Sequence, residues 1–246
     1  MSQNQIVKHA PSQLLFPLHM KGVNELFPGF EQGDFAVLHG LHSVNSLISL
    51  LCVQAQLPTQ LGGLGSNVVY IDGGNTFRLY QITRMAQLQK LTPKQVLDNI
   101  YISRAFTAYQ VTSLIMQHLK QAITQYNAKF AVISDIAGFF LDNGIPDDEA
   151  QRIFSQLTVY LSNFARENQI VLIATYLPHK ESKRDAFLKT LTCSRASVVL
   201  SLRKTGTDRE VVLEKHPRLN SGLVKLPSNT VTLESFFGAN SYGENS

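Results

Sequence analysis

Short, almost uninterrupted apolar runs recur along the chain and alternate with longer segments of helical periodicity. The runs that predict strands lie at residues 35–40, 67–72, 101–105, 130–135 and 170–175. The segments that predict helices lie at 48–55, 77–88, 107–125 and 146–168. Because continuously apolar strands are buried on both faces, this alternation predicts an α/β fold with a mostly parallel sheet covered by helices on both sides. Two further strand-like segments, 197–202 and 210–214, predict an antiparallel hairpin at one edge.

Four distinctive residues stand at the ends of predicted strands. They are Gly40, Asp72, Asp135 and Thr175. Ligands of an open α/β sheet bind beyond the carboxyl ends of its strands, so these residues mark a candidate rim. The two aspartates can equally act as caps of the following turns, and both interpretations stay open here. His39 and His42 flank Gly40 with no third ligand at a fixed spacing, so no metal site is expected.

The segment after the first predicted strand occupies the position of a phosphate-binding loop. Such a loop needs a second glycine so that backbone N–H groups can wrap the phosphates, a lysine for the β- and γ-phosphates, and a serine or threonine for magnesium. Counted from Gly40, these three places hold Asn45, Ser46 and Leu47. None of the requirements is met, so the sequence predicts a degenerate nucleotide site.

Composition places the chain among folded globular proteins, since 44% of its 246 residues are hydrophobic and 16% are charged. The cysteines, Cys52 and Cys193, are far apart in the sequence, which favours a reduced, intracellular protein. No apolar run reaches the roughly 18 residues of a membrane span, and residues 1–12 lack the apolar segment of a signal peptide. Neither a membrane nor a secreted protein is expected.

The positive charge is concentrated in one part of the chain. The net charge is +4, yet basic and acidic residues balance at eleven each up to Thr175, whereas residues 178–218 carry ten lysines and arginines against five acids. A local excess of this kind attracts polyanions, and a solvated surface loop explains it equally well.

Several blocks, in order along the chain, resemble one known family. The most specific is Val69–Arg78, which reads Val-Tyr-Ile-Asp-Gly-Gly-Asn-Thr-Phe-Arg. The others are Gly22–Leu26 with Gly33 and Asp34, Gln56–Pro58 with Gly62 and Gly63, Asn99–Phe106, the strand ending at Asp135, and Arg203–Lys204 with Pro217. They resemble the ATPase core of the RecA/RadA recombinases, in the archaeal and eukaryotic branch, without the N-terminal helical domain. The resemblance implies a RecA-like P-loop NTPase core over residues 20–227, preceded by a leader (1–19).

The resemblance also implies roles for three rim residues. Asp135 matches the aspartate that orients magnesium, and Arg78 matches the arginine that stacks on adenine. Gly74 stands where the family carries the glutamate that polarises water, so the general base is absent. This implies a paralogue without ATP hydrolysis, with no catalytic residue and no cofactor beyond low-affinity ATP and magnesium. The alternative is a DNA-dependent ATPase with an unusual site, in which Asp135 holds magnesium and a partner subunit supplies charge.

Residues 178–195 fall where the family places its second DNA-binding loop. The side chains implied to contact DNA are Lys180, Lys183, Arg184, Lys189 and Arg195, with His179 or Phe187 placed to stack on a base. The first DNA-binding loop matches 142–149, which is acidic in this chain and would repel a phosphate backbone. Contact with single- or double-stranded DNA is therefore expected through the later, basic segment.

The C-terminal tail, residues 228–246, is polar except for one apolar cluster. Thr230, Leu233, Phe236 and Phe237 resemble the peptide that binds the sliding clamp PCNA, with threonine in place of the usual glutamine. Phe236–Ala239 also matches the peptide by which recombinase subunits dock on each other, and packing of the tail on its own core is a third interpretation. The expected function is a non-catalytic adaptor of recombination and DNA repair, located in the cytoplasm with the nucleoid, or in the nucleus of a eukaryote.

Overall fold

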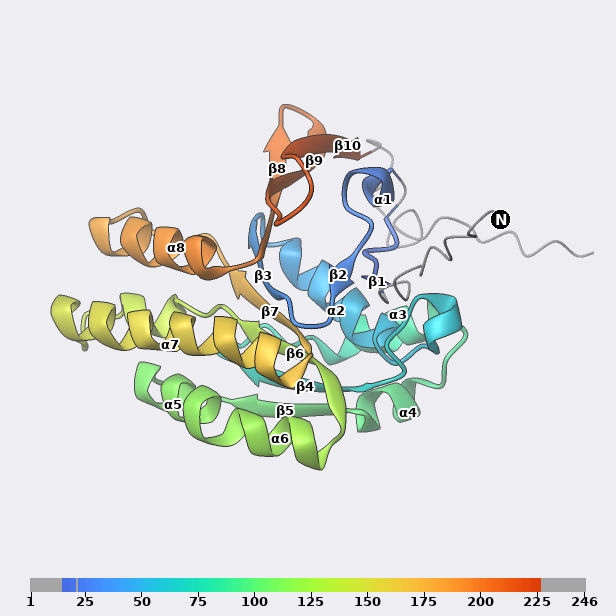
Figure 1. Cartoon of the computed structure of the whole chain (residues 1–246), viewed down its shortest axis with the longest axis horizontal. Coiled ribbons are helices and arrows are strands. Elements are labelled where there is room, and N and C mark those ends of the chain that lie inside the picture. The colour runs from blue at the N-terminus through green and yellow to red at the C-terminus, as the bar shows by residue number, and fades with distance from the viewer. Residues whose placement is uncertain (1–14, 21, 227–246) are drawn as a thin grey trace, which may run out of the picture.

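The computed structural model describes residues 15–20 and 22–226, which are built around an eight-stranded sheet (Figure 1). The strand order is β10-β9-β8-β3-β7-β6-β4-β5. The strands are β3 (Phe35–Gly40), β4 (Asn67–Asp72), β5 (Ile100–Arg104), β6 (Ala128–Ser134), β7 (Val171–Tyr176), β8 (Val198–Thr205), β9 (Asp208–Lys215) and β10 (Gly222–Leu226). Neighbouring strands from β8 to β5 pair in parallel. In this sheet only the β8–β9 and β9–β10 pairs are antiparallel. The predicted fold class is confirmed.

Helices cover both faces of the sheet because its strands send alternate side chains into two cores. In β3, Ala36 and Leu38 enter one core, whereas Phe35 and Val37 enter the other. The first core is covered by α2 (Val44–Gln54), α3 (Leu79–Leu88) and α4 (Pro93–Asp98). The second is covered by α5 (Ala108–Ser113), η2 (Leu114–His118), α6 (Leu119–Gln125), α7 (Asp147–Asn168) and α8 (Lys183–Arg195). Short 3₁₀ turns, η1 (Thr59–Leu61) and η3 (Gly138–Leu141), complete the connections.

The helix predicted over 107–125 contains a π-helical segment, η2. Its buried residues Val111, Ile115, Leu119 and Ile123 are spaced by four, which exceeds the about 3.6 residues of an α-helical turn. An uninterrupted α-helix would rotate this stripe away from the sheet. The wider π turn keeps all four side chains in the core.

A short N-terminal unit packs against the edge of the first core. It consists of β1 (Leu15–Phe16), α1 (Val23–Leu26) and β2 (Phe30–Glu31), and β1 pairs antiparallel with β2. Phe16 and Leu18 are fully buried, and the Phe16 ring lies edge-on to Phe130 of β6. The core therefore begins before residue 20, where the sequence interpretation placed the end of a leader. The remaining part of that leader and the tail lie outside the described residues.

Besides the N-terminal unit and the short 3₁₀ turns, three elements of the described chain were not predicted. The first, α4, is short and begins at Pro93, and the second, β10, extends the hairpin to three strands. The third is α8, which occupies most of the segment interpreted as a DNA-binding loop. Within residues 15–20 and 22–226, no helix has the length and apolarity to cross a membrane.

Candidate functional site

The turn between β3 and α2 is shaped by its contact with β8. Only Leu41, His42 and Ser43 connect the two elements. Gly40 has a φ of +103°, and a Cβ atom there would overlap with the carbonyl oxygen of Leu202 in β8. The same oxygen accepts a hydrogen bond from the Leu41 N–H at 3.0 Å. Glycine at position 40 is thus required by the close approach of β8.

The backbone N–H groups at the start of α2 are already used within the turn. Those of Val44, Asn45, Ser46 and Leu47 donate to carbonyl oxygens of residues 41–43, at 3.0 Å, 3.1 Å, 3.0 Å and 3.2 Å respectively. A helix N-terminus binds phosphate because its first N–H groups lack intrahelical partners and point at the anion. The tight turn engages the N–H groups of residues 44–47 in backbone hydrogen bonds, so these four groups do not point freely at an anion.

Side chains complete the closure of this turn. The amide nitrogen Nε2 of Gln81 in α3 donates to Ser46 Oγ at 2.9 Å, and Ser49 Oγ donates to Gln81 Oε1 at 3.2 Å. Leu47, at the place of the magnesium-binding hydroxyl, is buried in the first core. Gln81 therefore fixes Ser46, neither position 46 nor position 47 carries a cation, and Leu47 has no hydroxyl for magnesium.

Asp72 is fully buried and caps the turn after β4. Its Oδ1 accepts hydrogen bonds from the Thr76 N–H at 2.8 Å and from Ser134 Oγ at 3.0 Å. Its Oδ2 accepts from Arg104, whose NH2 nitrogen lies at 3.2 Å. With both oxygens engaged, Asp72 acts as the structural cap that one of the two sequence interpretations expected.

Asp135 adopts a left-handed backbone conformation, with φ of +47°, and its carboxylate is enclosed. Its Oδ1 lies 2.8 Å from Nε2 of His179, which follows β7. A Cβ at position 74 would lie 2.6 Å from the Asp135 Cβ, and one at Gly138 would lie 2.5 Å from Asp135 Oδ2. Gly74 therefore makes room for Asp135, and a glutamate at 74 does not fit this arrangement.

The imidazole of His179 lies against the Asp135 carboxylate. The hydrogen bond that the imidazole makes to this carboxylate raises the pKa of His179, in opposition to burial, which lowers it. The imidazole ring also lies edge-on to Tyr176, with the ring centres 5.9 Å apart. Because the ring is held on both sides, His179 is not free to stack on a base, as the sequence interpretation had suggested. The donor set around Asp135 does not fit a magnesium ion.

Arg78 lies on the exposed rim at the N-cap of α3. Its NH1 nitrogen donates to the carbonyl oxygen of Asn75 at 3.1 Å. Tyr80, two residues later, is 88% exposed. The position is accessible, as adenine stacking would require.

The basic segment forms a helix because Ser182 caps it. Ser182 Oγ accepts the Asp185 N–H at 3.0 Å, and Leu188 and Thr192 face the core. This Ser-x-x-Asp spacing is a capping signal that the sequence interpretation missed. Residues 178–195, which we call the basic arm, thus consist of a short loop and α8. The side chains of the arm that are exposed for contact with DNA are Lys180, Lys183, Lys189 and Arg195.

Arg184 differs from the other basic residues of the arm because its guanidinium group points inward. It donates to the carbonyl oxygens of Phe140 at 3.1 Å, Asp142 at 2.8 Å and Ile145 at 2.7 Å, and it pairs with Asp147. Its side chain is only 12% exposed. Arg184 therefore fastens α8 to the acidic loop, and we remove it from the candidate DNA contacts.

A second polar cluster ties the hairpin to the end of β3. Nε2 of His39 lies 2.9 Å from Glu214 Oε2, while Ser201 and Arg203 donate to Glu214 Oε1. Burial lowers the pKa of His39, although Glu214 acts in the opposite direction. His39 is therefore a packing residue. No pattern in the sequence pointed to Glu214 as the partner of His39, or to Gln81 as the partner of Ser46.

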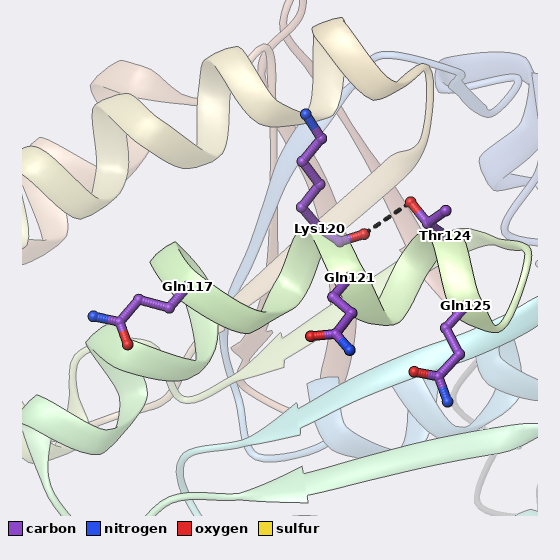
Figure 2. Close-up of a pocket in the computed structure, with 5 residues that line it drawn as sticks. All are labelled: Gln117, Lys120, Gln121, Thr124 and Gln125. Atoms are coloured by element: carbon purple, nitrogen blue, oxygen red, sulfur yellow. Dashed lines mark hydrogen bonds between the residues drawn. The ribbon is translucent and has the colours of Figure 1, made fainter.

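A shallow hollow lies on the helix formed by η2 and α6, away from the rim (Figure 2). It is lined by Gln117, Lys120, Gln121, Thr124 and Gln125. Thr124 Oγ1 donates to the Lys120 carbonyl oxygen at 3.0 Å, as Figure 2 shows. All five residues belong to one exposed helix, so the hollow is not part of the candidate site. In the part of the chain that is described, histidines, cysteines and acids form no group of three able to hold a metal.

The interaction peptide predicted at Thr230, Leu233, Phe236 and Phe237 lies outside the described residues. A family model described as Rad51 matches residues 19–189. The DNA repair and recombination protein RadA of Cenarchaeum symbiosum (strain A) is 29% identical over 124 residues. The aligned stretch covers 50% of this chain and 28% of that relative, so the match spans less than a third of the relative's length.

Proposed function

The chain belongs to the Rad51 family of RecA/RadA recombinases, and from this premise we propose that it acts in recombination and DNA repair as a DNA-binding protein that does not hydrolyse ATP. The tight turn at residues 41–43 is the observation that carries the proposal, because its carbonyl oxygens accept the N–H groups of residues 44–47 at the start of α2. Phosphate binding at a helix N-terminus depends on those groups.

The lost catalytic groups support the same conclusion. A preorganised charge or donor at a transferring phosphoryl group contributes about 3–4 kcal/mol to catalysis. This chain has Ser46 and Leu47 in place of the lysine and the hydroxyl, Gly74 in place of the general base, and His179 on the Asp135 carboxylate. The alternative of a DNA-dependent ATPase would need all of these contacts to rearrange.

Nucleotide binding is the direct test. We expect no change in the melting temperature of the full chain with millimolar ATP, with or without magnesium, and no phosphate release in the presence of DNA. Asp135→Ala serves as the comparison. If Asp135 were a magnesium ligand, its removal would abolish any thermal shift and any phosphate release. Saturable stabilisation together with turnover that this substitution abolishes would establish the ATPase instead.

The exposed basic side chains of the arm support DNA binding. Lys180, Lys183, Lys189 and Arg195 are exposed, and Phe187 is 40% exposed one helical turn after Lys183. Lysine and arginine neutralise phosphates, and an adjacent aromatic ring can stack on an unpaired base. These side chains form the proposed contact with single- or double-stranded DNA.

The adaptor role depends on the tail. Leu233, Phe236 and Phe237 supply the apolar groups of a clamp-binding peptide, and a RadA-type recombinase is the other partner considered. We expect the full chain to bind a PCNA-type sliding clamp, and expect the double substitution Phe236→Ala and Phe237→Ala to abolish the interaction in isothermal titration calorimetry. Equal binding by the wild-type and substituted chains would exclude this peptide as the clamp contact. Binding to a RadA-type recombinase alone would assign the tail to that partner.

A further inference from the structure

The Asp135 carboxylate, where the family resemblance implies a metal ligand, is joined in this chain to the basic arm. Asp135 directly follows β6, whereas His179 lies in the arm between β7 and α8. Their side chains meet at 2.8 Å although 44 residues separate them in the sequence. A carboxylate that would otherwise face the nucleotide is thus engaged by the element proposed to bind DNA.

The surroundings of Asp135 are built for this contact. Its backbone N–H donates to Thr175 Oγ1 at 2.8 Å, and Thr175 is fully buried at the end of β7. Gly74 and Gly138 leave space for the carboxylate, as described above. A left-handed backbone at a residue other than glycine is unfavourable and persists only where the surrounding structure holds it. The neighbours of Asp135 therefore fix its carboxylate in the orientation that receives His179.

The same contact positions the first part of the arm. His179 lies directly before Lys180, and the helix cap at Ser182 follows within three residues. Tyr176 supports the arm from the β7 side, since its hydroxyl donates to Asp185 Oδ1 at 2.8 Å. Beyond this point α8 packs along α7 (Figure 1). Between Tyr176 and Ser182, His179 is the side chain that links the loop to the rim.

We infer that the hydrogen bond between Asp135 and His179 holds the basic arm in its DNA-binding arrangement without nucleotide or magnesium. His179 is then a positioning residue, which acts through Lys180 and Lys183 and does not touch DNA itself. The inference rests on the proposed DNA-binding function. It predicts that the affinity of this chain for DNA does not depend on ATP.

The test combines DNA affinity with amide hydrogen exchange on the full chain. For a labelled single strand and its duplex, we expect the wild-type dissociation constant to change by less than about twofold on addition of ATP and magnesium. His179→Ala should raise the dissociation constant for DNA by about fivefold or more, because the binding-competent arrangement of the arm becomes a minor population. The same variant should accelerate exchange of the Asp185 and Ala186 amides, which donate to Ser182 at the start of α8, by about tenfold, with the strands of the sheet unchanged.

Conservative variants separate positioning from general destabilisation. His179→Gln keeps a donor and Asp135→Asn keeps an acceptor, so both should restore most of the affinity, whereas Asp135→Ala should behave as His179→Ala does. Lys180→Ala is the matched control, since it should weaken DNA binding with no change in exchange. Unchanged exchange in His179→Ala, or wild-type affinity that rises about tenfold or more with ATP and magnesium, would overturn the inference. If the wild-type chain binds no DNA, the proposed function fails, while the exchange measurement still decides whether His179 holds the arm.

Discussion

Replacing Gly40 by alanine is expected to lower the free energy of unfolding by about 3–5 kcal/mol. A Cβ at this position overlaps with the Leu202 carbonyl oxygen, so β3 and β8 must separate in the centre of the sheet. The φ of +103° adds strain for any residue with a side chain. Urea denaturation followed by circular dichroism measures the loss.

Gly206→Ala is the matched control for this substitution. Gly206 also has a positive φ, +62°, but nothing lies within 4 Å of its missing Cβ. Its replacement should therefore cost only the left-handed backbone strain, about 1–2 kcal/mol. If Gly40→Ala costs no more than Gly206→Ala, the approach of β8 is not what requires glycine at position 40. A phosphate-binding role for that glycine would then regain support.

Two adjacent basic residues of the arm are expected to give opposite results. Arg184→Ala should lower the free energy of unfolding by about 2–4 kcal/mol, because three carbonyl oxygens lose a charged donor. Lys183→Ala should change the stability by less than about 0.5 kcal/mol, since its side chain is exposed. Lys183→Ala should instead weaken DNA binding and reduce the magnitude of the slope of log K against log salt concentration by about one.

The salt dependence of DNA binding distinguishes these roles. A residue that neutralises a phosphate contributes to the slope of log K against log salt, whereas a residue that only fastens the helix does not. Titrations of both variants at several salt concentrations, together with urea denaturation, provide the comparison. A reduced slope for Arg184→Ala with unchanged stability would show that Arg184 is released from the acidic loop and contacts DNA.

The sequence predicted the sheet and its order of elements well because the relevant signals are local. Continuous apolar runs identified β3, β4, β6 and β7, and polar residues at 205–208 identified the hairpin. The arm was interpreted as a loop because the family resemblance places a DNA-binding loop there, and the cap at Ser182 was missed. The π segment could not be anticipated from composition, although the four-residue spacing of its buried stripe contains the cause.

At the candidate site, the sequence shows which side chains are present, whereas it does not show which contacts they make. The absence of a lysine at Ser46 and of a metal-binding hydroxyl at Leu47 can be read from the sequence directly, and the degenerate nucleotide site that it implies stays a prediction. The partner of Ser46 could not be found this way. Gln81 is 35 residues away in the chain, and only the packing of α3 on α2 brings it there.

The sequence by itself determined the alternation of strands and helices, the family resemblance and the missing phosphate-binding groups, because periodicity and residue identity are properties of short segments. The tertiary structure alone decided which polar groups are free. Arg184 is engaged and Lys183 is exposed, although they are neighbours on one helix. Asp135 faces His179 and not solvent. Hydrogen bonding and burial depend on contacts between distant segments, and these exist only once the sheet has brought its strands together.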